Sequence, residues 1–251
     1  MFKLNLYTLK GPKVMQRSVY LNEFDLLEMV DEPQGGIITK IIDDCFELFQ
    51  EAPGSSHNHQ AWPGGYWDHV METMNFAVEL YALMSQIRPL GFPLSEALVV
   101  IFLHDIEKPW KYKLDSGGRL VDNPDIPNKA ARKAFRDAKL SEYGLVLSPR
   151  QLNAMLYVEG ELDDYTNSQR VMWPLAAFCH MCDIASARVW PSSPAPQGEE
   201  DNWLRAERIN KAAVYPENVD PRECPHCAYL ILGDIHDEAE KLCLSCGNPL
   251  A

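Results

Sequence analysis

The chain has 251 residues, of which 46% are hydrophobic and 24% are charged, and its net charge is −13. These proportions are typical of a soluble globular protein with a substantial core, and they exclude a disordered or low-complexity chain. The negative charge disfavours broad, non-specific binding to duplex nucleic acid, because like charges repel at long range.

Neither a membrane helix nor a signal peptide is expected. The longest apolar run is the seven residues from Ala97 to Leu103, far fewer than the roughly 20 that a membrane helix needs. The N-terminal residues are interrupted by polar side chains and lack a small-residue cleavage site. We therefore expect a cytoplasmic protein without a membrane partner.

Three helices are predicted in the first half of the chain. Residues 37–51 and 66–87 have apolar residues at spacings of three and four, which is typical of amphipathic helices. The next helix should begin after Pro93 with Ser95 as its N-cap and reach Asp105. It is apolar on all sides, so it should lie buried in the centre. Pro109 is expected to end it.

The second half is also predicted to be mostly helical. Asp115-Ser-Gly-Gly is typical of a turn in a short hairpin, and helices are expected at about 127–139, 149–160, 172–188 and 201–213. Residues 191–198 are rich in proline and serine and indicate a linker. We therefore divide the chain into a helical domain (1–190), a linker with a helix (191–223) and a small module (224–251).

Four side chains in the helical domain are candidate metal ligands. His69 lies early in a helix, His104 and Asp105 end the most apolar helix, and Asp183 lies in another apolar helix. Burying an unpaired carboxylate costs on the order of several kcal/mol, so Asp183 requires a partner. Imidazole and carboxylate donors from three helices suit a divalent transition metal, manganese or magnesium.

Each of these residues also has an ordinary interpretation. A histidine near a helix start commonly lies on the surface or forms a hydrogen bond, and a His-Asp doublet at a helix end can face solvent. Asp183 can instead pair with Arg170 or Arg188. Spacing alone does not decide between these interpretations.

Three segments together resemble the HD-domain metal-dependent phosphohydrolases. They are Gly64-Gly-Tyr-Trp-Asp-His69, Leu103-His-Asp-Ile-Glu-Lys108 and Met181-Cys-Asp-Ile-Ala-Ser-Ala187, and the resemblance covers roughly residues 55–190. It implies a mainly α fold, an HD-type helical bundle. One branch of that family, which includes 3′–5′ exoribonucleases, has glycine where this chain has Glu107.

The resemblance also implies roles for particular residues. His69, His104, Asp105 and Asp183 would hold one divalent ion, which can be Mn, Mg, Fe, Co, Ni or Zn. Lys108 would face the substrate phosphate, and Asp105 would also orient the attacking water. A second tightly held metal is not expected, because no histidine lies between His104 and His180.

The implied reaction is hydrolysis of a phosphoester or phosphoanhydride. The favoured substrate is a nucleotide or a related small phosphate. Two alternatives remain open: a 3′–5′ exonuclease on single-stranded RNA or DNA, and a non-catalytic binding protein with the HD fold.

Five neighbouring residues are candidates for substrate binding or for support of the metal ligands. His59 precedes the first motif, and His180 lies three residues before Asp183 on the same helical face. Glu159 can contact the site or lie in a solvated loop. Arg132 and Lys133 belong to a basic stripe at 129, 132, 133 and 136, which is either a solvated face or a phosphate-gathering surface.

The C-terminal module contains Cys224-Pro-His-Cys227 and Cys243-Leu-Ser-Cys246. Two C-x-x-C pairs with fifteen residues between them are typical of a structural, four-cysteine zinc ribbon. A module this small should depend on its metal to fold. Its acidic side chains favour docking or homo-oligomerisation over contact with nucleic acid.

Overall fold

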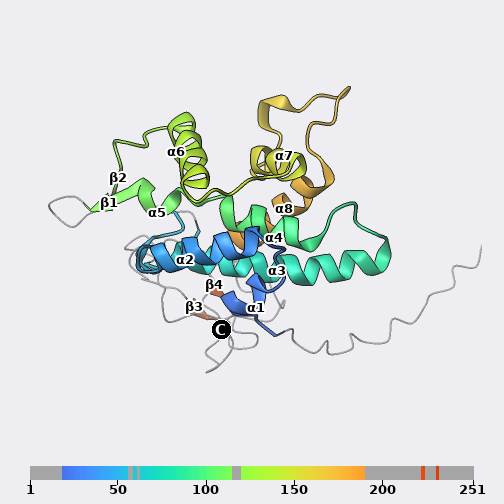
Figure 1. Ribbon diagram of the computed structural model, residues 1–251, viewed down its shortest axis with the longest axis horizontal. Coiled ribbons are helices and arrows are strands. Elements are labelled where there is room, and N and C mark those ends of the chain that lie inside the picture. The colour runs from blue at the N-terminus through green and yellow to red at the C-terminus, as the bar shows by residue number, and fades with distance from the viewer. Residues whose placement is uncertain are drawn as a thin grey trace, which may run out of the picture.

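The computed structural model describes residues 19–55, 59–60, 63–114, 120–189, 222–223 and 230–231. This part of the chain is mainly α-helical (Figure 1), as the sequence predicted. Among the described residues, no helix is both long and apolar enough to cross a membrane.

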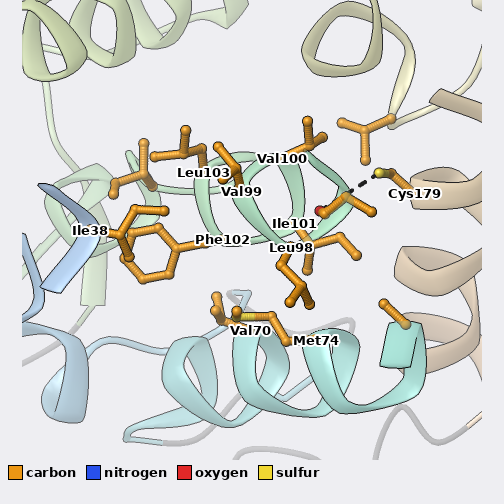
Figure 2. Packing of buried hydrophobic residues seen from close by; sticks show 14 of the residues in the cluster. Ile38, Val70, Met74, Leu98, Val99, Val100, Ile101, Phe102, Leu103 and Cys179 are labelled. Atoms are coloured by element: carbon orange, nitrogen blue, oxygen red, sulfur yellow. Dashed lines mark hydrogen bonds between the residues drawn. The ribbon is translucent and has the colours of Figure 1, made fainter. Parts of the chain in front are cut away.

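The central element is α4 (Leu94–Leu103), in which seven consecutive residues from Ala97 onward are buried. Helix α3 (Gly65–Ile87) packs along one side of α4 and contributes Val70 and Met74 to the shared core (Figure 2). Ile38 of α2 (Gln34–Glu51) and Cys179 of α8 (Pro174–Ile184) belong to the same core cluster around α4. Each large apolar side chain buried here contributes about 1.5–3 kcal/mol, so the C-terminal end of α4 is held in a fixed place.

The predicted start and end of this helix were wrong in detail. Pro93 occupies the N-cap position, while the buried Ser95 hydroxyl accepts a hydrogen bond from the backbone N–H of Asp31 at 2.8 Å. The helix ends at Leu103, well before Pro109. Pro109 instead lies in the first turn of α5 (Lys108–Lys111), where the missing N–H costs nothing because that position has no helical acceptor.

The predicted hairpin is present, with β1 (Tyr112–Leu114) antiparallel to β2 (Leu120–Asp122) and Lys113 opposite Val121. Helices α6 (Lys129–Glu142) and α7 (Pro149–Tyr157) follow. In Figure 1 both lie on the side of α4 that faces away from α3. The remaining helical segments are short: α1 (Glu23–Leu27), the 3-10 turn η1 (Leu162–Asp164) and the π-helical turn η2 (Ala185–Val189).

Little of the predicted C-terminal organisation falls within the described residues. The linker at 191–198, the helix at 201–213 and the four cysteines of the predicted zinc ribbon all lie outside them. Two short strands that flank Cys224 and Cys227 in the sequence are described. They are β3 (Arg222–Glu223) and β4 (Leu230–Ile231), which pair antiparallel with Arg222 opposite Ile231.

Candidate metal centre

Three side chains from three helices lie close together at the C-terminal end of α4. His69 of α3, His104 at the end of α4 and Asp183 of α8 place their ligand atoms within 4.8 Å of one another. His69 Nε2 lies 3.3 Å from His104 Nε2 and 3.2 Å from Asp183 Oδ1, and His104 Nε2 lies 3.6 Å from the same oxygen. Donors about 2.1 Å from a common ion, at angles near 90–109°, are about 3.0–3.4 Å apart. The cluster therefore has nearly the spacing of a metal site.

The hydrogen bond of His104 sets which ring nitrogen faces this cluster. Its Nδ1 lies 2.6 Å from the backbone carbonyl oxygen of Ile101 and donates to it. In the neutral ring, Nε2 then carries the lone pair, and it points toward His69 and Asp183. A bond of this kind fixes the tautomer and the ring orientation of a metal-ligating histidine.

His69 is oriented by a longer chain of hydrogen bonds. Its Nδ1 lies 3.0 Å from Ser186 Oγ, and the Ser186 hydroxyl donates to Glu72 Oε2 at 2.6 Å. Gln60 Nε2 also contacts Glu72 Oε2 at 3.3 Å and Ser186 Oγ at 3.2 Å. Because the Ser186 hydroxyl donates its hydrogen bond to the Glu72 carboxylate, its oxygen accepts a hydrogen bond from the N–H at His69 Nδ1. In the neutral ring, His69 Nε2 is then unprotonated and faces the cluster.

The backbone conformation and packing before α3 require the two glycines at positions 64 and 65. Gly64 adopts a φ of 80° at the N-cap of α3, a conformation that glycine adopts without strain. A Cβ atom on Gly65 would lie 1.8 Å from the backbone oxygen of Gln60. Gln60 itself has a φ of 41°, which is unusual for a residue with a side chain. The loop is thus packed directly against the start of α3, and this contact positions both Gln60 and His69.

Asp105 lies beside the cluster but also has another partner. Its Oδ2 is 3.1 Å from His104 Nε2, 3.7 Å from His69 Nε2 and 2.5 Å from Lys108 Nζ. The four residues named by the sequence therefore lie close together, with Lys108 next to them. In this arrangement Lys108 shares the carboxylate oxygen of Asp105 that faces the histidines.

The electrostatics of the cluster favour a cation. Burial alone would raise the pKa of Asp183, but hydrogen bonds and charge from His104 and His69 hold it well below its usual range. Burial lowers the pKa of His69, whereas Asp105 and Asp183 overcome burial and raise the pKa of His104. With the two Nε2 atoms 3.3 Å apart, only one proton fits between them. Two imidazole lone pairs and a carboxylate therefore suit a divalent ion at this place.

Lys108 remains charged in spite of its burial. Burial opposes the ammonium form, but Asp105, together with the more distant Asp183, raises the pKa of Lys108 above its usual value. The side chain is 16% exposed. A buried but accessible cation of this kind can contact an anionic group that approaches the cluster.

His59, a candidate for substrate binding or for support of the metal ligands, also lies next to the cluster. Its ring is 5.1 Å from that of His69, and its Nδ1 lies 2.6 Å from Gln60 Oε1. Burial, with the charge of Lys108, lowers the pKa of His59 to about 4. The ring is therefore neutral near pH 7.

Two other candidates do not join the cluster. His180 Nδ1 lies 2.6 Å from the backbone oxygen of Val158 and donates to it. Glu159 is 58% exposed and lies 3.4 Å from Lys129 Nζ, which agrees with the solvated-loop interpretation. Asp183 bonds to the two histidines, and within the described chain neither Arg170 nor Arg188 forms an ion pair with it.

The basic stripe of α6 lines a cavity of about 450 Å³ that reaches His104. Lys133 pairs with Asp137 at 2.6 Å, whereas Arg132 has no ion-pair partner among the described residues. Arg136 Nη1 donates to the backbone oxygen of His104 at 2.9 Å. The basic stripe therefore forms part of the wall of this cavity.

Three residues that support the cluster were not predicted from the sequence: Gln60, Glu72 and Ser186. A positional signal was present for two of them, since Glu72 follows His69 by three residues and Ser186 follows Asp183 by three. Residues three apart lie on the same helical face. Burial raises the pKa of Glu72 to about 7, so the carboxyl group that accepts from Ser186 titrates near neutral pH.

Comparison of the chain with protein-family models, with curated proteins and with solved structures finds no match in any of the three.

Proposed function

We propose that the protein is a metal-dependent phosphohydrolase of the HD type, which hydrolyses a phosphoester or phosphoanhydride of a nucleotide or related small phosphate. One observation carries the proposal: His69, His104 and Asp183 converge within 4.8 Å, beside Asp105 and Lys108. This is the residue set that the HD resemblance requires, and it comes from three separate stretches of the chain.

Each residue has a task in this reaction. A divalent cation, when bound, supplies a Lewis acid that polarises a phosphoryl oxygen and makes water more acidic. Lys108 stabilises the negative charge that develops on the phosphoryl group. Asp105, whose pKa is held low, accepts a hydrogen bond from the attacking water and orients it. The water oxygen bonds to phosphorus and loses one proton, the P–O bond to the leaving group breaks, and the leaving oxygen gains one proton, so that protons balance overall.

A small substrate is favoured over a polymer. The net charge of −13 repels a polyphosphate backbone. Two lysines of the basic stripe, Lys129 and Lys133, already face Glu159 and Asp137. Fewer free cations are then left to follow an extended chain of phosphates.

The test is a screen of nucleotides and short oligonucleotides with each of the six candidate metals and product analysis. We expect release of inorganic phosphate or pyrophosphate from at least one nucleotide, and loss of both activity and site metal in His104→Ala and Asp105→Ala. The control variant Ser141→Ala, at an exposed position on α6, should keep both the activity and the site metal. Full activity in either ligand variant would rule out the HD assignment.

The exonuclease alternative rests on Arg132, the stripe residue without an ion-pair partner in the described chain. A protein that follows a nucleic-acid backbone loses affinity steeply as salt rises, on the order of a hundredfold between about 50 and 200 mM for several phosphate contacts. We expect a weak salt dependence and faster turnover of mononucleotides. A steep dependence, with oligonucleotide cleavage lost in Arg132→Glu, would favour the exonuclease instead. Metal binding without any turnover in the screen would favour a non-catalytic binding protein.

A further inference from the structure

A cavity between α6 and α7 has chemistry that the metal centre does not use. It is about 450 Å³ in volume and is bounded by the end of α4, by α6, by α7 and by the residues that follow α7. His104 borders it, so the cavity adjoins the metal centre through one of its ligands. Its two walls differ in character, because α6 contributes four cations among its lining residues and α7 contributes apolar side chains.

One residue that lines the cavity is a buried carboxylate with an unused acceptor. Glu107 is 9% exposed at its side chain, and its Oε2 has no hydrogen-bond donor within the described part of the chain. Arg136 Nη1 lies 3.7 Å from this oxygen, too far for a hydrogen bond, and donates to the backbone oxygen of His104 instead. A buried acceptor without a donor is costly, typically about 1–3 kcal/mol and more for a charged group. A ligand N–H at this position would remove that cost.

A second lining residue near Glu107 offers donors. A guanidinium group has five N–H donors, and Arg136 uses one of them on the His104 carbonyl. An acceptor on Glu107 and donors on Arg136 thus lie side by side. This pair complements a ring edge that carries an N–H next to a carbonyl or ring nitrogen.

The two walls match the rest of such a molecule. On the apolar wall, Met155 of α7 is buried and Leu152 of the same helix is 57% exposed, and Leu140 of α6 adds a buried apolar side chain to the opposite wall. An apolar ring would cover this exposed leucine. Arg132 on the opposite wall, which has no ion-pair partner within the described chain, is placed to attract an anionic group.

We infer that this cavity binds the heterocyclic ring of a phosphorylated substrate, and that Glu107 and Arg136 select the ring by its pattern of donors and acceptors. The inference rests on the proposed function for the nature of the substrate, and it adds a ring-binding site and the residues that determine ring specificity. The ring can belong to a free nucleotide or to the terminal residue of a single strand, because both present the same edge.

The experiment measures binding to the full-length protein in a mild chelator, so that hydrolysis does not interfere. The probes are the four common nucleoside 5′-monophosphates, ribose 5-phosphate, which lacks a ring base, and a single-stranded tetranucleotide. At least one monophosphate should bind about tenfold or more tightly than ribose 5-phosphate, since a hydrogen bond to a buried charged group is worth about 1.5–3 kcal/mol. Tighter binding of the tetranucleotide would identify a strand end as the source of the ring.

Two pairs of variants place the ring in the cavity. Glu107→Gln should reduce the preference for the base-bearing probe to about threefold or less, while Glu142→Gln on the outside of α6 should not change it. Leu152→Glu should weaken the same probe without changing the fold, and Leu83→Glu on α3, which is also 57% exposed, should have no effect. Equal binding of ribose 5-phosphate and all four monophosphates, or an unchanged preference in both Glu107→Gln and Leu152→Glu, would overturn the inference. Ring-selective binding without hydrolysis in the metal screen would overturn the proposed function and leave the ring site standing.

Discussion

Ser186 Oγ lies 3.0 Å from His69 Nδ1, although the two residues are 117 positions apart in the sequence. The contact exists because α8 continues into the π-helical turn η2, which packs against α3. The Ser186 hydroxyl in turn donates a hydrogen bond to Glu72, which lies on the same helix as His69. The orientation of a predicted metal ligand thus depends on a residue from the far end of the helical domain.

Replacement of Ser186 by alanine should weaken metal binding. Without its hydroxyl oxygen, His69 Nδ1 loses its acceptor and the ring is no longer held with Nε2 toward the cluster. Loss of such a partner typically costs about 10–100-fold in metal affinity. Titration of Mn²⁺ into protein that has been freed of metal with a chelator measures this affinity. The control Ser141→Ala, on the exposed side of α6, should bind Mn²⁺ as tightly as the parent. Equal affinity in Ser186→Ala would show that the hydrogen bond does not position His69.

Replacement of Lys108 by methionine should reduce hydrolysis while the site metal is retained. Removal of a positioned charge that stabilises a transition state typically costs about 10²–10³-fold in kcat. Metal content and phosphate release are measured on the same preparation. Lys111→Met on the same short helix is the control, because Lys111 contacts Tyr112 rather than Asp105. If Lys108→Met keeps the parental kcat, Lys108 does not act on the phosphoryl group.

Metal affinity should rise with pH between about 6 and 8. In the metal-free chain Asp105 and Asp183 overcome the effect of burial and raise the pKa of His104, so below that raised pKa a proton occupies the position that the metal needs. Below that pKa, the fraction of chains with a neutral His104 rises about tenfold per pH unit. The metal affinity should therefore increase about tenfold per unit and level off once His104 is neutral. Calorimetry in buffers of different ionisation enthalpy should show release of about one proton per bound Mn²⁺. An affinity independent of pH would contradict this.

Replacement of Gly65 by alanine should destabilise the folded domain. The added Cβ would lie 1.8 Å from the backbone oxygen of Gln60, so either the loop or the start of α3 must move. Overpacking of this kind costs about 1–3 kcal/mol or more, and it should lower the free energy of unfolding measured in urea. Gly91→Ala is the matched control, because nothing lies within 4 Å of a Cβ at that glycine. Equal stability of the two variants would contradict the packing described here.

Cys224→Ser should remove one tightly held zinc per chain, if the four C-terminal cysteines form the predicted ribbon. Elemental analysis of protein purified without strong chelators tests this. Cys45→Ser is the control, since Cys45 is a free thiol on α2. Finding no zinc in the parent protein would refute the ribbon.

The sequence by itself determined the helical class and the order of the main elements, because the spacing of apolar residues depends only on local geometry. It also singled out His69, His104, Asp105, Asp183 and Lys108 as candidates, since their types and order resemble a known pattern, and these side chains lie close together. Local signals were less reliable at helix ends. Ser95 has the chemistry of an N-cap but bonds to Asp31 instead, and this choice depends on a segment 64 positions away.

Only the tertiary structure decided which neighbours support the site. Gln60, Glu72 and Ser186 become a unit because the loop before α3 and the turn after α8 meet at one face of α3. Glu159 and His180 were also candidates by sequence, but they lie with other partners. The unused acceptor of Glu107 is likewise a tertiary property, because Arg136 lies near it yet donates to the His104 carbonyl. Hydrogen bonds need distances within a few tenths of an ångström, and a one-dimensional pattern does not contain such distances.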